Sequence, residues 1–141
     1  MNEFEKCLKN RKIVSSPGIQ VETKPEFKAA VEDLKDAKAL FRQNRFKYAT
    51  IAGYYSLFHS ARALLYSKGY REKSHYCLRV AIAELFVKEK ILDFNFLDFF
   101  DEAIGLREAA DYENVFSKDG AKRVIKNAEK FLSTVKEILK I

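Results

Sequence analysis

Residues that break helices are almost absent from most of this chain, and their absence constrains the fold more than any other feature. Only five Gly and two Pro occur in 141 residues, and both Pro lie before residue 26. A protein built from many short strands needs frequent turns, and Gly and Pro are the residues that favour turns. The sequence therefore predicts an all-α fold made of long helices.

The first long helix is expected from about residue 25 to 43. Thr23 can cap its N-terminus, Glu26 can reach back to complete a capping box, and Pro25 loses no needed hydrogen bond in the first turn. Apolar side chains then recur at helical spacing: Phe27, Ala30, Val31, Leu34, Ala37 and Phe41. Residues 1–22 are expected to form an N-terminal arm or a short helix.

The second long helix is expected at about 46–68. It is apolar on nearly every face between Ala49 and Tyr66, which predicts a place at the centre of the protein. Gly69 follows as a C-terminal cap and begins a basic turn that ends at Ser74.

Three more helices complete the expected fold. They lie at about 75–90, over a segment that ends near Ala110, and at about 118–140, where Ser117 can cap the helix. The pattern predicts an up-and-down bundle of four long helices with short N-terminal and connecting helices. We expect a single domain over residues 1–141, with the bundle at 23–141.

Charge is unevenly distributed along the chain. The net charge is +6, yet residues 93–113 carry seven acidic side chains and one basic one, so this segment is −6 and the remainder is +12. A surface divided in this way suits self-association or an RNA partner. Solvated helix faces are the simpler alternative.

The sequence lacks the signals of several protein classes. No run of about 18 uncharged apolar residues could span a membrane, and the charged N-terminus lacks the apolar part of a signal peptide. We therefore expect a cytoplasmic protein. Cys7 and Cys77 fit no metal or redox spacing and are expected to be two reduced, partly buried thiols. We expect no metal site and no cofactor.

One side of the second helix carries an unusual set of polar side chains. At about 100° per residue, they fall within roughly 60° of arc: Tyr48, Tyr55, His59, Arg62 and Tyr66. Phenols and arginine can stack on bases or hold phosphates. The alternative is a hydrogen-bonded polar seam where this helix meets another helix or a second subunit.

Two shorter clusters could also bind an anion. Arg107 and Asp111 are four residues apart, so they can pair along one helix face and leave other donors of Arg107 free for a phosphate. Arg71 and His75 lie where the basic turn meets the third helix, and a helix N-terminus can bind an anion. A helix-end ion pair and a solvated turn are the respective alternatives.

Three segments together resemble the small prokaryotic members of the HEPN superfamily (higher eukaryotes and prokaryotes nucleotide-binding). They are residues 52–65 with the sequence AGYYSLFHSARALL, residues 69–75 with GYREKSH, and residues 106–112 with LREAADY. Their order and spacing carry the resemblance, which covers nearly the whole chain.

The resemblance implies an α-helical bundle that often forms a homodimer, associates with nucleotides or RNA, and pairs with a small nucleotidyltransferase in a toxin–antitoxin-like system. Active members of the family are metal-independent ribonucleases. They use an Arg followed after four to six residues by a His, and dimerisation brings two copies of this motif into one cleft. In some pairs the partner adenylylates a Tyr just after the motif, which makes Tyr112 a candidate modification site.

This sequence departs from the family pattern after Arg107. No His follows that residue, and Asp111 stands in the corresponding region. A carboxylate beside an Arg has a lowered pKa and is a weak proton acceptor, so Asp111 suits an orienting role better than that of a general base. Arg71 and His75 are separated by three residues only, and they precede a different helix.

The favoured hypothesis is a non-catalytic HEPN module that binds a nucleotide or RNA. In it, the phosphate lies on Arg62 and Arg107, Arg71 adds a further cation, and Tyr55 and Tyr112 stack or form hydrogen bonds.

Two alternatives remain, so the sequence leaves open whether the protein is an enzyme. One is a metal-independent ribonuclease that uses Arg107 with His59 or His75, and the other is a dimeric scaffold without a ligand. The first two hypotheses require Arg62, His59 and Arg107 to converge in one solvent-reachable hollow.

Overall fold

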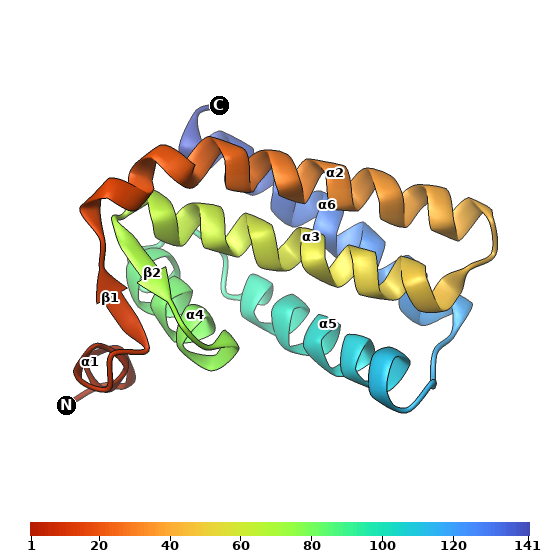
Figure 1. The fold of residues 1–141 in the computed structure, drawn as a ribbon, viewed down its shortest axis with the longest axis horizontal. Coiled ribbons are helices and arrows are strands. Elements are labelled where there is room, and N and C mark those ends of the chain that lie inside the picture. Colours follow the sequence, from red (N-terminus) through yellow and green to blue (C-terminus); the bar gives the residue numbers. More distant parts are fainter.

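The central element of the structure is α3, Phe46–Ser67, as its continuous apolar sequence predicts. In the computed structural model, which describes residues 1–141, α3 packs against three other long helices (Figure 1). These are α2, Thr23–Arg42, α5, Asn95–Tyr112, and α6, Lys118–Leu139. Of the 22 residues of α3, 13 are buried, so this helix forms much of the core. The predicted all-α bundle with four long helices is confirmed.

Glycine and serine define the packing and the ends of the central helices. A Cβ atom on Gly53 would lie only 2.8 Å from Cγ1 of Val124, so this glycine allows α3 and α6 to approach closely. Gly69 has a φ of +79° and follows the end of α3, as predicted. Ser117 is confirmed as the cap of α6, because its Oγ accepts the N–H of Gly120 at 2.9 Å.

The N-terminal residues include the short helix expected from the sequence, followed by a strand and a 3-10 helix that it does not predict. These three elements are α1, Glu3–Lys9, β1, Ile13–Ser15, and a 3-10 helix, Pro17–Glu22. β1 pairs antiparallel with β2, Tyr70–Glu72, with Val14 opposite Arg71. The segment expected to be a basic turn therefore contains a strand. Its partner lies far away in the sequence, so the local pattern does not reveal the pairing.

The helix expected at 75–90 is shorter than predicted. α4, His75–Ile82, continues into a π-helical turn, Ala83–Val87, before the chain leads into α5. Figure 1 shows α4 beside β2, below the end of α3. None of the helices combines the length and the apolar character that crossing a lipid bilayer would require.

The expectation of two reduced thiols is wrong. Cys7 and Cys77 form a disulfide that joins α1 to α4, with their Cα atoms 5.8 Å apart. The two cysteines are 70 positions apart in the sequence, and both are almost fully buried. Only the packing of α1 on α4 brings them together, so their spacing alone could not predict the bond.

The capping box expected at the start of α2 is also wrong. Thr23 is itself the first residue of the helix, and no side chain caps the preceding Glu22 position. The Oγ1 of Thr23 is buried without a hydrogen-bond partner. The carboxylate of Glu26 turns toward α3, where it meets His59 and Arg62 instead.

Candidate functional site

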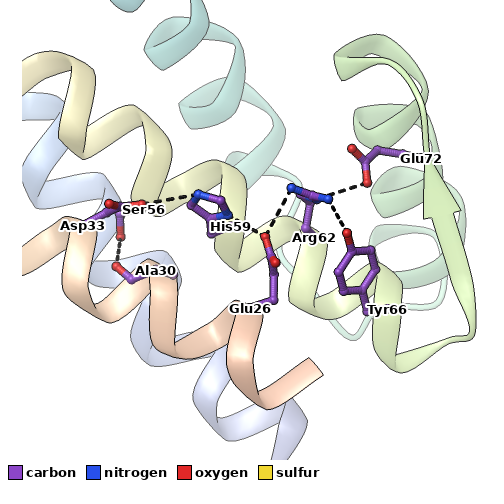
Figure 2. Close-up of polar contacts among 8 residues, drawn as sticks. All are labelled: Glu26, Ala30, Asp33, Ser56, His59, Arg62, Tyr66 and Glu72. Atoms are coloured by element: carbon purple, nitrogen blue, oxygen red, sulfur yellow. Dashed lines mark hydrogen bonds and ion pairs between the residues drawn. The ribbon is translucent and has the colours of Figure 1, made fainter. Parts of the chain in front are cut away.

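The polar side of α3 forms a seam with the start of α2. Figure 2 shows the carboxylate of Glu26 between His59 and Arg62. Nδ1 of His59 lies 2.5 Å from Oε1 of Glu26, and Nε2 of the same ring lies 3.4 Å from Oδ2 of Asp33. Burial raises the pKa of Asp33, although His59 opposes this effect. Both ring nitrogens of His59 therefore face carboxylates.

Arg62 is also engaged by carboxylates within this seam. Its Nη1 lies 3.4 Å from Glu26, its Nε lies 3.2 Å from Glu72 on β2, and its Nη2 donates a hydrogen bond to the hydroxyl of Tyr66. Burial raises the pKa of Glu72, even though the charge of Arg62 lowers it. We call the group of Glu26, Asp33, His59, Arg62, Tyr66 and Glu72 the polar seam.

A second group gathers around Arg107 near the end of α5. Its Nη2 donates a hydrogen bond of 3.0 Å to the hydroxyl of Tyr55 and lies 3.4 Å from Oδ2 of Asp111. The centre of the guanidinium lies 5.5 Å from the ring centroids of Tyr54 and Tyr55, and 5.4 Å from that of Tyr112. Contacts of this length are cation–π interactions, so three phenol rings hold the guanidinium.

Two of the nitrogens of Arg107 lack partners. Nε is buried without a hydrogen bond, and Nη1 takes part in no hydrogen bond or ion pair in a side chain that is 16% exposed. The Tyr112 ring beside the guanidinium is 72% exposed, so this part of the group lies at the surface. An anion could reach Nη1 without breaking an existing ion pair.

His75, the first residue of α4, belongs to the same group. Its ring lies parallel to that of Tyr54, with an angle of 7° between the planes, and its Nδ1 is 2.5 Å from the Tyr54 hydroxyl. Burial and then the positive charge of Arg107 lower the pKa of His75. Burial raises the pKa of Tyr54, which keeps its phenol protonated. We call Tyr54, Tyr55, His75, Arg107 and Tyr112 the Arg107 cluster.

The hydrogen bond to Tyr54 assigns the proton on the imidazole of His75. The Tyr54 side chain is fully buried, and its hydroxyl has no other partner. A buried hydroxyl is best satisfied when it donates, so we assign Nδ1 as the acceptor and Nε2 as the site of the proton. In its neutral form His75 then presents a donor at Nε2.

Comparison with known proteins identifies the family, because the HEPN domain matches residues 26–138. The chain belongs to the HEPN domain family. A protein of Methanocaldococcus jannaschii named "Putative toxin MJ0605" is 30% identical over 92% of this chain and 97% of its own length. A UPF0332 protein of Thermotoga maritima is 30% identical over 78% of this chain and 85% of its own length. The resemblance found in the sequence is confirmed, and this HEPN protein is similar to proteins with toxin names.

In this HEPN protein the polar seam and the Arg107 cluster lie next to each other along α3. The ring centroids of Tyr55 and His59 are 6.2 Å apart, and the Phe58 ring lies 4.9 Å from the ring of His75 and 5.2 Å from the guanidinium of Arg62. Tyr55, His59, Arg62 and Tyr66 of α3 are therefore contiguous, whereas Tyr48 lies apart, half-exposed beside Arg45 and Lys47. The contiguous residues divide into two groups with different partners, because His59 and Arg62 meet carboxylates and Tyr55 meets Arg107.

Arg71 also joins neither group. It is exposed on β2, and no ion pair or hydrogen bond connects its side chain to the polar seam or to the Arg107 cluster. No group of three or more His, Cys, Asp or Glu side chains is arranged to hold a metal ion.

Two residues of these groups are not among the candidates that the sequence indicates. Tyr54 lies in the stretch of α3 that reads as apolar, yet its hydroxyl orients His75. Glu26 is expected in a helix cap, yet it joins His59 to Arg62. A signal for Glu26 does exist, because an acidic residue on the inner side of an amphipathic helix needs a cationic partner.

Proposed function

We propose that this HEPN protein binds RNA through the Arg107 cluster, as a non-catalytic component of a toxin–antitoxin-like pair. The observation that carries the proposal is Arg107 itself, whose guanidinium is held between phenol rings while Nη1 has no partner. A fixed guanidinium with a free donor is suited to a phosphate oxygen, and an exposed phenol such as Tyr112 is suited to stacking on a base.

Arg107 is a better phosphate ligand than Arg62. Two carboxylates already neutralise Arg62, so an incoming phosphate would meet negative charge from Glu26 and Glu72. Arg107 has a single acidic neighbour within 4 Å, Asp111, and that carboxylate is partly exposed to solvent. The proposal therefore assigns Arg62 to the stability of the polar seam and Arg107 to the ligand.

Binding fits the two histidines better than catalysis does. His59 has a carboxylate at each ring nitrogen, so neither nitrogen is free to accept a proton from RNA. His75 accepts from Tyr54 at Nδ1 and presents Nε2 as a donor, which suits a hydrogen bond to a phosphate oxygen. A general base would need a free lone pair at Nε2.

The proposal includes a partner and a second copy of the chain. The name of the Methanocaldococcus jannaschii relative, a putative toxin, supports a role in a pair with a neutralising protein, and the HEPN resemblance suggests a nucleotidyltransferase and a homodimer. Tyr112 is 72% exposed beside Arg107, which leaves its hydroxyl accessible to a partner that transfers a nucleotide.

Replacing Arg107 by Ala is expected to weaken RNA binding by a factor of about 10 to 100, because hydrogen bonds to charged groups contribute about 1.5–3 kcal/mol. Fluorescence anisotropy with a labelled single-stranded RNA measures the affinity. Arg123→Ala is the matched control, because Arg123 is an exposed arginine that pairs with Glu102 away from the cluster.

The same RNA incubated in EDTA distinguishes binding from cleavage. The proposal predicts that the RNA stays intact. If the RNA is cleaved, and cleavage is lost in both Arg107→Ala and His75→Ala, the protein is a ribonuclease and not a non-catalytic binding module.

In the anisotropy experiment, equal affinities of wild type and Arg107→Ala for the RNA would exclude the Arg107 cluster as the binding site.

A further inference from the structure

A groove with four cationic side chains lies between α2 and α6, on elements that contribute nothing to the Arg107 cluster. Its volume is about 420 Å³, and its walls carry Lys38 and Arg42 from α2 and Lys122 and Lys126 from α6. A hollow of this size falls within the range of ligand-binding clefts, about 300–1,000 Å³.

The cations are arranged as two pairs that face one another across the groove. Lys38 and Arg42 are four residues apart on one helix, and so are Lys122 and Lys126 on the other. Four residues correspond to one helical turn and to a rise of about 6 Å, so each wall presents two cations on one face. That spacing is comparable to the distance between successive phosphates in an extended nucleic-acid strand.

Most of this positive charge is not neutralised within the protein. Glu129 is the single acidic side chain that lines the groove, and it forms an ion pair with Lys38. Arg42, Lys122 and Lys126 take part in no ion pair, and all three are exposed. The lining therefore has a net charge of +3, which attracts polyanions.

The acidic segment of the chain lies away from this groove. Residues 93–113 include α5, which packs on α3 and α6, whereas the groove is lined by side chains of α2 and α6. Figure 1 shows α2 above α3 and α5 below it. The +3 lining of the groove thus comes from helices other than the one that carries most of the acidic segment. A polyanion is attracted to such a lining.

We propose that the α2–α6 groove binds the phosphate backbone of a single-stranded RNA, as a second contact in addition to the Arg107 cluster. The inference rests on the proposed function for its ligand, but it rests on different residues. Exposed Lys and Arg side chains commonly contact the phosphates of a nucleic acid, whereas other contacts, to the edges of the bases, read its sequence. The phosphate contacts add affinity that depends on salt and not on sequence.

An acidic protein partner fits the groove less well. The apolar part of the lining is limited to Phe41 and Ile125, and Ile125 is only 9% exposed. Protein interfaces usually rely on buried aromatic or apolar anchors in a core from which Lys is depleted. A phosphate strand needs charge above all, and that is what the groove offers.

The test compares two double variants with the same change in charge. Lys122→Gln with Lys126→Gln removes two cations from the groove, and Lys130→Gln with Lys136→Gln removes two exposed cations elsewhere on α6. All four residues are exposed, so both variants should fold, and thermal melts followed by circular dichroism confirm this. Anisotropy with a labelled 20-nucleotide RNA is measured from 50 to 300 mM salt.

The groove variant is expected to bind roughly tenfold more weakly at the lowest salt concentration, and its slope of log K against log salt should fall by about 1.4. The control variant should change much less. Equal losses in the two variants would reduce the effect to general charge and overturn the proposal. A second result would also overturn the proposal: the wild-type protein binds poly-glutamate but not RNA, and the groove variant loses the binding of poly-glutamate. That result would identify an acidic protein as the partner.

Failure of the groove is distinguishable from failure of the Arg107 cluster. If Arg107→Ala weakens binding and the groove variant does not, the proposed function stands and the second contact falls. If the groove variant alone weakens binding, the groove stands and the Arg107 cluster falls.

Discussion

The Arg62→Ala variant is expected to lose about 3 kcal/mol of its free energy of unfolding, because removing one partner from a buried ion pair leaves an uncompensated charge. The side chains that lose their partner are Glu72, which is 9% exposed, and Glu26, which is 15% exposed. This expected loss lies at the lower end of the losses measured when buried ion pairs are broken, because the side chain of Arg62 is itself 23% exposed. Urea denaturation at pH 7 measures the loss.

The loss should depend on pH in a defined direction. The pKa of Glu72 in the folded protein already lies above the value of 4.5 for a free carboxyl, because the group is buried, and removing Arg62 raises it further. A group whose pKa is higher in the folded protein than in the unfolded protein stabilises the fold when the pH is below its unfolded pKa. This stabilisation is lost as the pH rises through its folded pKa. The difference in the free energy of unfolding between variant and wild type should therefore shrink as the pH falls from 7 toward the unfolded value of 4.5.

Arg123→Ala serves as the control for this stability measurement, because Arg123 forms an exposed ion pair with Glu102 and should change stability little. If Arg62→Ala and Arg123→Ala are equally stable, the polar seam does not stabilise the fold as described.

Loss of the disulfide should have an effect of similar size. The bond between Cys7 and Cys77 closes a loop of 70 residues. In the loop-closure treatment, a loop of this length contributes about 4 kcal/mol by restricting the unfolded chain. Replacing both cysteines by Ala should therefore lower the free energy of unfolding by about that amount, measured by urea denaturation without reductant.

Two controls belong to the disulfide prediction. Wild-type protein treated with a strong reductant should approach the stability of the double variant, and the double variant should not respond to the reductant. Thiol titration of unfolded, unreduced protein should detect no free thiol, since both cysteines are paired. Two free thiols at that step would contradict the bond.

The sequence predicts the long helices well because their signals are local. The apolar face of α2 and the apolar stripe of α6 can be read at helical spacing within each segment, and the central place of α3 follows from its own composition. Gly69 and Ser117 mark helix ends for equally local reasons. The strands β1 and β2 and the disulfide depend on partners far away in the sequence, and no local pattern encodes such a pairing.

The candidate site follows the same division. The polar stripe on α3 is visible in the sequence because its members share one helix face. Its partners come from other elements: Glu26 from α2, Glu72 from β2 and Arg107 from α5. The role of each cation depends on whether its partner is a carboxylate or a phenol. That partner is known only once the helices are packed.

Phosphate bound by Arg107 must lie close to His75, because both side chains contact Tyr54. The chain has only two histidines, so NMR can follow both imidazoles, and His75→Ala assigns the signals. In the free protein the pKa of His75 should lie below the usual 6.5. It should rise in Arg107→Ala, because the repulsive charge is gone.

The decisive measurement is the pKa of His75 with and without a saturating single-stranded RNA. A phosphate at the Arg107 cluster places negative charge beside the imidazole, so the pKa of His75 should rise when wild-type protein binds RNA. An unchanged pKa of His75 in a complex that anisotropy shows to be fully formed would place the RNA elsewhere and contradict the proposed site.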